Sequence, residues 1–107
     1  MDYIELGERR LRVEVNWNAY GELLDFCGKT SFDDLAEVLG DFSPKGAMRL
    51  MAACINEGER MDGHDVRFSP QDIGAMVSRD GHEIPEFMRI YTSQSTPAVP
   101  EDSKKKE

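Results

Sequence analysis

The side chains of this 107-residue chain best suited to metal or nucleophile chemistry are its cysteines and histidines: Cys27, Cys54, His64 and His82. Structural zinc sites draw their ligands in close pairs such as C-x-x-C or H-x-x-x-H, and these four residues all lie far apart. Both cysteines fall within apolar patterns of helical spacing, where thiols tend to be inert. We therefore predict neither a metal nor a cofactor. Spacing leaves open a Cys–His nucleophile pair, because such partners meet only in the fold.

A second polar stretch, Asp62-Gly63-His64-Asp65, has the residue types of a metal or acid–base site. It lacks the further acidic positions and the closing glutamate of a calcium-binding loop. Asp-Gly is also a common turn, and we interpret the stretch as one. The sequence contains no Gly-rich phosphate loop, no G-x-S-x-G elbow and no H-E-x-x-H motif. These observations predict that the chain is not an enzyme.

The composition suits one domain with a modest core, since 39% of the residues are hydrophobic and 32% are charged. The formal net charge is -8, whereas a nucleic-acid binder needs a basic face, so we predict no nucleic-acid partner. No apolar run is long enough to span a bilayer, and the start MDYIELGERR lacks the pattern of a secretion signal. We expect a cytoplasmic protein with free thiols that makes no use of a membrane.

Alternating apolar and polar residues predict a β-hairpin over residues 3–15. Its apolar side chains all fall on one face: Ile4, Leu6, Leu11, Val13 and Val15. We expect a four-residue turn that sets Leu6 opposite Leu11 and Glu5 opposite Arg12. A tighter two-residue turn would set Asp2 opposite an apolar residue, and we disfavour it for that reason. A two-stranded hairpin is marginal alone, so it must pack on helices or offer its edge to another chain.

Helical periodicity and capping signals predict four to five short helices after the hairpin. The first is expected to be capped by Asn16 or Asn18 and to bury a stripe that includes Trp17. A short second helix is expected to begin at Ser31 and to carry Phe32 inward.

Two further helices open with the same Phe-Ser-Pro signal, in which Ser43 or Ser69 is the cap and proline takes the first helical position. The last helix is expected to begin at Pro85. Because the rest of the two segments does not align, we interpret the shared opening as capping chemistry and not as a repeat. Residues 1–94 are thus predicted to form a single, mostly helical α+β domain. Residues 95–107 lack an apolar stripe and are predicted to be a disordered charged tail.

With no active site expected, the surface becomes the candidate for function. The chain has six methionines, which either fill an irregular core or serve surfaces that adapt to apolar partners. We select as contact residues the two arginines on the outer hairpin face, four helical methionines and one tyrosine of the last helix: Arg10, Arg12, Met48, Met51, Met76, Met88 and Tyr91. Reversing the charge of the two arginines is expected to leave folding intact.

The order of the segments along the chain carries a family resemblance. A short hairpin leads into NWNAYGELLDFCGK, then MRLMAACINEGERMDGHDVRFSPQDIGAMV and IPEFMRIYTSQ, followed by a charged tail. Asn56-Glu57-Gly58 forms a Gly-containing polar stretch, and Ser69-Pro70-Gln71-Asp72 forms a Ser/Thr-Pro-x-Asp/Glu helix start. This combination resembles the small tail assembly chaperones of tailed phages and prophages, and the resemblance covers nearly all of residues 1–94.

The resemblance implies binding and no catalysis. Members of that family coat the long, aggregation-prone tape measure protein, help to recruit tail tube subunits and are absent from the finished particle. For this chain it implies those two partners, met in the cytoplasm of the host bacterium. The hairpin edge or a neighbouring helix groove would then take up an apolar segment of the client. The same surfaces would also allow self-association.

Two other interpretations of the sequence remain. The first is an acidic regulatory or inhibitor protein that binds a basic or nucleic-acid-binding partner. Its binding would depend strongly on salt. The second is a small enzyme, which would require a pocket that brings His64 or His82 beside a thiol or a carboxylate.

Overall fold

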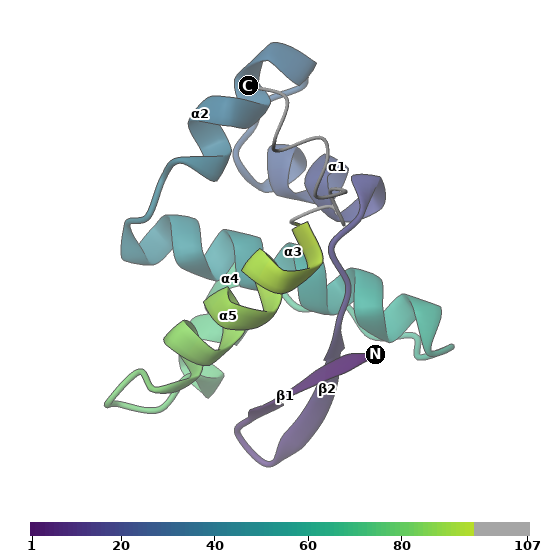
Figure 1. Cartoon of the computed structure of the whole chain (residues 1–107), viewed down its shortest axis with the longest axis vertical. Helices are drawn as coiled ribbons and strands as arrows, with labels where there is room; N and C mark the ends of the chain where they lie inside the picture. Colours follow the sequence, from purple (N-terminus) through teal and green to yellow (C-terminus); the bar gives the residue numbers. More distant parts are fainter. Residues whose placement is uncertain (96–107) are drawn as a thin grey trace, which may run out of the picture.

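The computed structural model describes residues 1–95 and places a two-stranded hairpin ahead of five α-helices (Figure 1). The elements are β1 (Asp2–Leu6), β2 (Arg9–Val13), α1 (Trp17–Phe26), a 3-10 turn (Phe32–Asp34), α2 (Leu35–Leu39), α3 (Pro44–Met61), α4 (Pro70–Met76) and α5 (Glu83–Ser95). This confirms the predicted α+β class with mostly helical content. The predicted disordered tail lies outside the described residues, except for Ser95, which ends α5. None of these helices has the length and apolarity needed to cross a bilayer.

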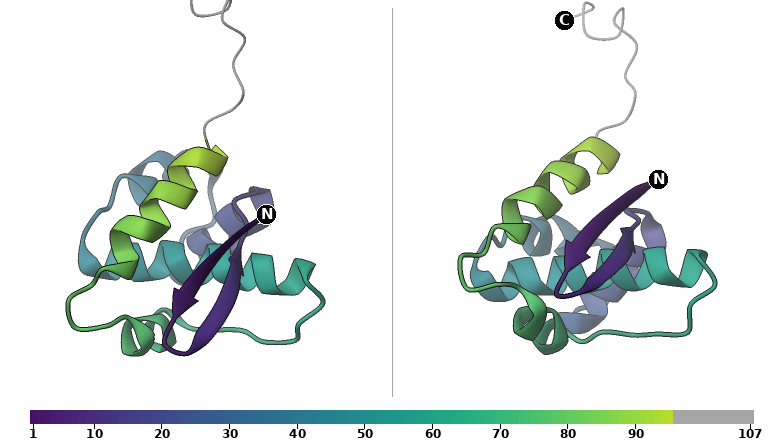
Figure 2. Two further views of the ribbon diagram at one scale, coloured as in Figure 1. Left: turned by 60° about the horizontal axis from the view of Figure 1, so that its bottom comes forward. Right: turned by 90° about the horizontal axis from the view of Figure 1, so that it is seen from below.

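Helix α3 is the central element, and the hairpin, α1 and α4 pack against it (Figure 2). All residues from Leu50 to Glu59 are buried, which is typical of a helix surrounded by other elements. Its start is the predicted one, because the Ser43 side chain accepts a hydrogen bond from the backbone N–H of Gly46. Buried Leu50, Met51 and Ile55 place the core along this helix.

Strand β2 lies directly on α3 because Gly58 has no side chain. A Cβ atom at Gly58 would stand 2.2 Å from the backbone oxygen of Arg12. The close approach lets the outer edge of β2 bond to the helix: the Glu14 N–H donates to the Cys54 carbonyl at 3.1 Å, and the Arg12 N–H donates to Glu59 Oε2 at 3.0 Å. This edge of the hairpin is therefore covered.

The predicted hairpin register was wrong by two residues. The turn contains two residues, so that Ile4 lies opposite Leu11 and Asp2 lies opposite Val13. Gly7 has a φ of +63°, and a glycine with positive φ at the first central position is typical of a type II′ turn, which suits the twist of a tight hairpin. Because a shift of two residues keeps every side chain on its face, four of the five residues of the predicted apolar face are nevertheless buried, and Val15 is half-buried.

The two-residue turn places Asp2 opposite the apolar Val13, and Gln94 of α5 compensates for this unfavourable pair. Its Nε2 donates both to the Asp2 carboxylate and to the Val13 carbonyl, each at 2.9 Å. Its Oε1 accepts from the Val15 N–H at 2.7 Å. One amide side chain from the far end of the described chain thus satisfies the open end of the hairpin.

Two aromatic side chains expected in the core are exposed. Asn16 caps α1 as predicted, but Trp17 beside it is 67% exposed, and Phe32 at the start of the 3-10 turn is 71% exposed. Helix α1 turns Ala19 and Leu23 to the core instead. Because α1 is short and packs on α3 along one side only, its first residue falls outside the buried stripe.

Asn56 fixes the segment between α3 and α4. Its Oδ1 accepts from the Phe68 N–H at 2.7 Å, and its Nδ2 donates to the Phe68 carbonyl at 2.8 Å. The next residue, Ser69, starts α4 with a capping box in which its side chain and that of Asp72 bond to each other's backbone N–H groups. The predicted start of α4 is confirmed.

Candidate binding surfaces

The seven predicted contact residues do not form one surface. Met51 is fully buried, so its selection as a surface contact was wrong; its place on the main apolar stripe of α3 accounts for the burial. Met48, Met76 and Met88 are half-buried and line three different hollows. Tyr91 lies half-buried on α5. The two arginines of the hairpin differ sharply in their surroundings.

Arg12 is a structural residue that ties the hairpin to the end of α3. Its guanidinium lies 2.7 Å from Asp62 Oδ1 and 3.2 Å from Glu14 Oε1, and only 12% of its side chain is exposed. Tyr3 donates to the other Asp62 oxygen at 2.9 Å. The hydrogen bonds from Arg12 and Tyr3 lower the pKa of Asp62. Arg10, by contrast, is exposed and stacks over the Tyr3 ring at 4.4 Å.

The charged cluster at the start of α5 is accounted for by its own hydrogen bonds. Ligand-type atoms of Asp80, His82 and Glu83 lie within 4.8 Å of one another. The buried Glu83 carboxylate accepts from the backbone N–H and the hydroxyl of Ser78. Burial alone would raise the pKa of Glu83, but backbone and Ser78 hydrogen bonds lower it. His82, 2.8 Å from Asp80, has a raised pKa for that reason. The cluster joins the α4–α5 loop to the start of α5.

The remaining titratable candidates also have structural partners. His64 Nδ1 lies 2.8 Å from Glu59 Oε1, within the predicted turn, in which Gly63 has a φ of +83°. Burial raises the pKa of the Cys54 thiol, which is wholly enclosed. Within residues 1–95, the side chains of both histidines hydrogen-bond to carboxylates or a hydroxyl, and neither forms a hydrogen bond to a cysteine.

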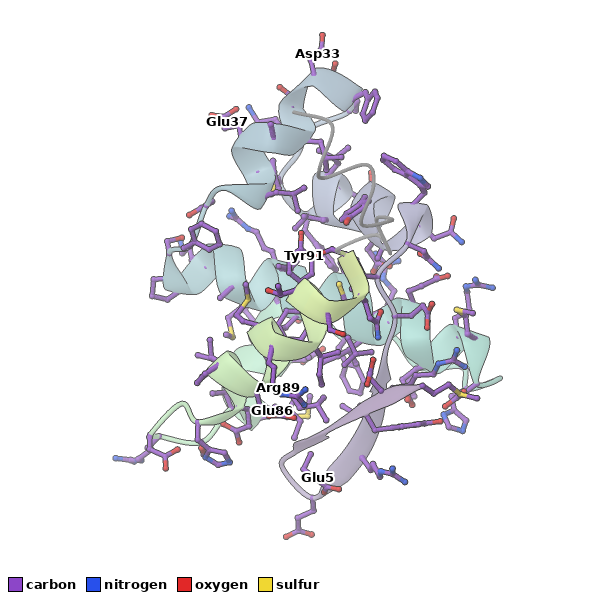
Figure 3. All side chains as sticks on the ribbon, viewed as in Figure 1. Glu5, Asp33, Glu37, Glu86, Arg89 and Tyr91 are labelled. Atoms are coloured by element: carbon purple, nitrogen blue, oxygen red, sulfur yellow. The ribbon has the colours of Figure 1, made fainter. Side chains whose placement is uncertain are left out.

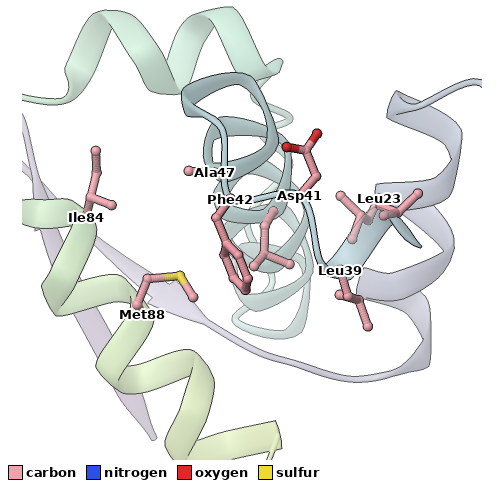
Figure 4. A pocket seen from close by; sticks show the side chains of 9 residues that line it. Leu23, Leu39, Asp41, Phe42, Ala47, Ile84 and Met88 are labelled. Atoms are coloured by element: carbon pink, nitrogen blue, oxygen red, sulfur yellow. The ribbon is translucent and has the colours of Figure 1, made fainter. Parts of the chain in front are cut away.

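An apolar groove opens between α2, α3 and α5 and is hereafter called the α2–α5 groove (Figure 4). Its volume is about 160 Å³. Phe42 is 76% exposed, and in Figure 4 its ring lies between Met88 of α5 and Leu39 of α2. The lining is apolar apart from one carboxylate, with the residues Leu23, Val38, Leu39, Asp41, Phe42, Ala47, Leu50, Ile84 and Met88.

Backbone contacts hold Phe42 at the mouth of this groove. Asp41 accepts from the Ser43 N–H at 3.0 Å, and its hydrogen bonds to Ser43 lower its pKa. A Cβ atom on Gly46 would stand 2.2 Å from the Asp41 carbonyl oxygen, so the link between α2 and α3 lies tightly on the first turn of α3. With both of its neighbours fixed, Phe42 extends toward solvent.

A second feature is a row of aromatic rings that runs from the core to the surface, here called the aromatic row. Phe87, fully buried on α5, stacks on Tyr91 at 6.3 Å. Burial, together with the nearby Tyr20 hydroxyl, raises the pKa of Tyr91 to about 12. Trp17 meets Tyr20 edge-on at 5.2 Å, and Phe32 meets Trp17 edge-on at 5.6 Å. The ring contacts Phe32–Trp17–Tyr20 and Tyr91–Phe87 are thus joined through the hydroxyls of Tyr20 and Tyr91.

The exposed aromatics lie in the most acidic part of the chain. Residues 17–42 carry six carboxylates and one lysine, a net charge of -5 out of -8. Asp33 and Glu37 extend outward from the 3-10 turn and α2 (Figure 3). Among the described residues, Asp33, Asp34 and Glu37 form no ion pair. Apolar surface and unpaired negative charge therefore occur together.

Sequence periodicity missed Trp17, Phe32 and Phe42 as surface residues. A usable signal was nevertheless present, because each of the three lies directly beside a helix-capping residue. A side chain at the very end of a helix lies outside the stripe of residues that the helix buries. The three caps concerned are Asn16, Ser31 and Ser43. Helical spacing alone assigned the first two aromatics to the core.

Comparison with family models, curated proteins and solved structures finds no match to this chain. The family resemblance of the sequence therefore stays a prediction. The apolar features of the described surface include the α2–α5 groove and the exposed end of the aromatic row.

Proposed function

We propose that this chain is a tail assembly chaperone of the phage and prophage type. In this role it is a non-enzymatic binding protein that keeps a long tape measure protein soluble and helps to recruit tail tube subunits. It acts in the bacterial cytoplasm and leaves before the particle is complete. The sequence resemblance suggests these partners, and the α2–α5 groove is the observation that supports a binding role.

The size of the groove fits a client that is held at many weak sites. Its volume of about 160 Å³ is close to that of a cavity that accepts one benzene ring. An amphipathic helix would place one aliphatic or aromatic anchor in it, and burying such a side chain contributes about 1.5–3 kcal/mol. One site of this strength binds weakly. Many copies along a long helical client would keep its apolar stripe out of water, while their negative charge keeps the loaded complex soluble.

Co-expression tests the proposal. The chain is produced together with the long helical protein encoded just downstream of its gene, and the soluble fraction of that protein and its co-purification are measured. We expect the long protein to be soluble only in the presence of the chain, and the two to elute together. A long protein that stays insoluble in the presence of the chain would contradict the proposal.

Two substitutions locate the effect. Phe42→Asp puts a charge at the mouth of the groove, whereas Val66→Asp changes another exposed apolar residue that does not line it. We expect the client to lose solubility with Phe42→Asp and to keep it with Val66→Asp. Equal solubility of the client with the two variants would show that the α2–α5 groove is not the site that keeps the client soluble.

A second candidate is the acidic regulatory protein, which the concentration of negative charge in residues 17–42 favours. In that case the partner is basic and is held mainly by charge. Raising the ionic strength separates the candidates, because exposed charges are screened while apolar contacts persist. Loss of the client at high salt favours the regulator, and retention favours the chaperone.

A further inference from the structure

We infer that Trp17 and Phe32, the exposed end of the aromatic row, form a docking surface for a basic amphipathic helix. Neither residue lines the α2–α5 groove, so this inference goes beyond the proposed function and holds for either candidate role. Large apolar side chains exposed side by side mark interaction sites more often than scattered ones do. Trp17 is 67% and Phe32 is 71% exposed, and their ring centroids are 5.6 Å apart.

The two rings are already held in place for binding. Trp17 rests edge-on against Tyr20, whose hydroxyl lies close to that of half-buried Tyr91. Binding of a partner therefore costs little additional side-chain freedom of Trp17 and Phe32. Aromatic residues anchored in this way are the type that dominates binding energy in protein interfaces.

The partner is expected to be basic. Asp33 and Asp34 adjoin Phe32 in the chain, Glu37 follows one helical turn later, and none of the three forms an ion pair within residues 1–95. A Lys or Arg of the partner would meet these carboxylates and the face of the indole ring, which attracts cations. An acidic partner, including a second copy of this chain with its net charge of -8, would be repelled.

The hollow along α1 beside Trp17 has a shape that suits a helical partner. Trp17, Gly21 and Asp25 follow one another at four-residue spacing and line a shallow hollow of about 510 Å³ along α1. Lys29 and Arg67 also line it, and the charge of Arg67 is paired with Glu22 at 3.0 Å. Such a row on one helix packs against the ridges of another. Gly21 has nothing within 4 Å of the position of a Cβ atom, so the backbone of a partner helix can approach closely.

Trp17 provides the measurement, because it is the only tryptophan of the chain. The full chain is titrated with a synthetic peptide of about five helical turns that has Leu on one face and Lys on its flanks. The matched probe has Glu in place of each Lys. We expect the emission of Trp17 to shift to the blue and to saturate with the Lys peptide only. The affinity should fall about tenfold between roughly 50 and 300 mM NaCl.

Two matched variants locate the binding. Phe32→Ala is expected to weaken the Lys peptide about tenfold or more, since it removes one of the two anchors. Phe42→Ala, which removes an equally exposed ring outside this surface, is expected to leave the affinity unchanged. Far-ultraviolet circular dichroism confirms that both variants are folded.

Three results would overturn the inference. The first is equal binding of the Lys and Glu peptides, and the second is full affinity in Phe32→Ala. The third comes from a chain that ends at Ser95. If removal of residues 96–107 changes the Trp17 emission and exposes a site that was filled before, the occupant is the chain's own Lys104–Lys106 segment and not a partner helix.

Discussion

Arg10 and Arg12 are two positions apart in β2, yet their surroundings predict opposite responses to mutation. Arg12→Glu would place a carboxylate beside Asp62 and Glu14, at a site where the side chain is only 12% exposed. We expect a loss in the free energy of unfolding that is clearly larger than for Arg10→Glu, because removing the cation leaves Asp62 and Glu14 without their partner. Arg10→Glu should change it by less than about 1 kcal/mol.

Urea unfolding followed by circular dichroism compares the two variants. The sequence alone treated both arginines as free surface residues whose charge reversal leaves folding intact. For Arg12 the structure contradicts that prediction. Similar stability of the two variants would show that the link between the hairpin and α3 contributes little.

Glu57 should make stability depend on acid pH. Hydrogen bonds from Arg60, and in addition from Asn16 and Asn18, lower its pKa from an ordinary value of 4.5 to about 2, against the opposing effect of burial. A carboxylate with a lowered pKa in the folded state contributes stability above about pH 4.5, which is lost as the pH falls toward 2. Glu57→Gln should therefore be less stable by about 1–2 kcal/mol at pH 7.

Thermal unfolding of the wild type and of Glu57→Gln between pH 7 and pH 2 checks this prediction. Other carboxylates with lowered pKa, such as Asp62, titrate in both proteins, so the difference between the two isolates Glu57. The difference should shrink as the pH falls. A constant difference across the range would contradict the assignment.

At the scale of single residues, the sequence indicated that helical methionines are candidate contacts, but it did not indicate which of them reach the surface. Met88 was selected as a contact residue and does line the α2–α5 groove, whereas Met51 is fully buried. Both lie on apolar stripes of helices. What separates them is how completely neighbouring elements cover each helix, and the spacing within one helix does not contain that information.

At the scale of the elements, the position of a glycine decides where another segment can approach a helix closely. Gly21 and Gly58 both lie inside helices, but a Cβ atom has free space at Gly21 and would stand 2.2 Å from the Arg12 oxygen at Gly58. Gly21→Ala should stabilise the protein by about 0.5–1 kcal/mol, because alanine favours the helix. Gly58→Ala should destabilise it by about 3 kcal/mol or more, since strand and helix must separate.

Midpoints of chemical unfolding for this pair check the β2–α3 contact. For a domain of this size, each kcal/mol corresponds to about 4–8 °C in melting temperature, so a thermal melt also resolves the two variants. A Gly58→Ala protein as stable as the wild type would show that β2 does not lie directly on α3.

Most elements could be predicted because their signals are local. The caps at Asn16, Ser43 and Ser69 and the apolar face of the hairpin lie within a few residues of what they determine. The hairpin register could not be predicted, because Gln94 stabilises it from 92 positions away. The Asn56 contacts with the Phe68 backbone are equally invisible in a local pattern.

At the scale of the whole molecule, charge and apolar surface are unevenly distributed. Residues 17–42 hold a net charge of -5 together with the three most exposed aromatic side chains: Trp17, Phe32 and Phe42. Elsewhere the described surface carries ion pairs, such as the Arg89–Glu86 pair on α5. This distribution suits a protein that works by covering apolar parts of another chain while the complex stays in solution.

The central claim is that the chain acts by stoichiometric binding. The most direct measurement dilutes the denatured long helical client into buffer that contains increasing amounts of the chain, and follows light scattering. The account predicts that scattering falls in proportion to the chain added and reaches its minimum at a fixed molar ratio, at which the two proteins elute together. Scattering that is unaffected, or that is suppressed by a trace of the chain without a stable complex, would contradict it.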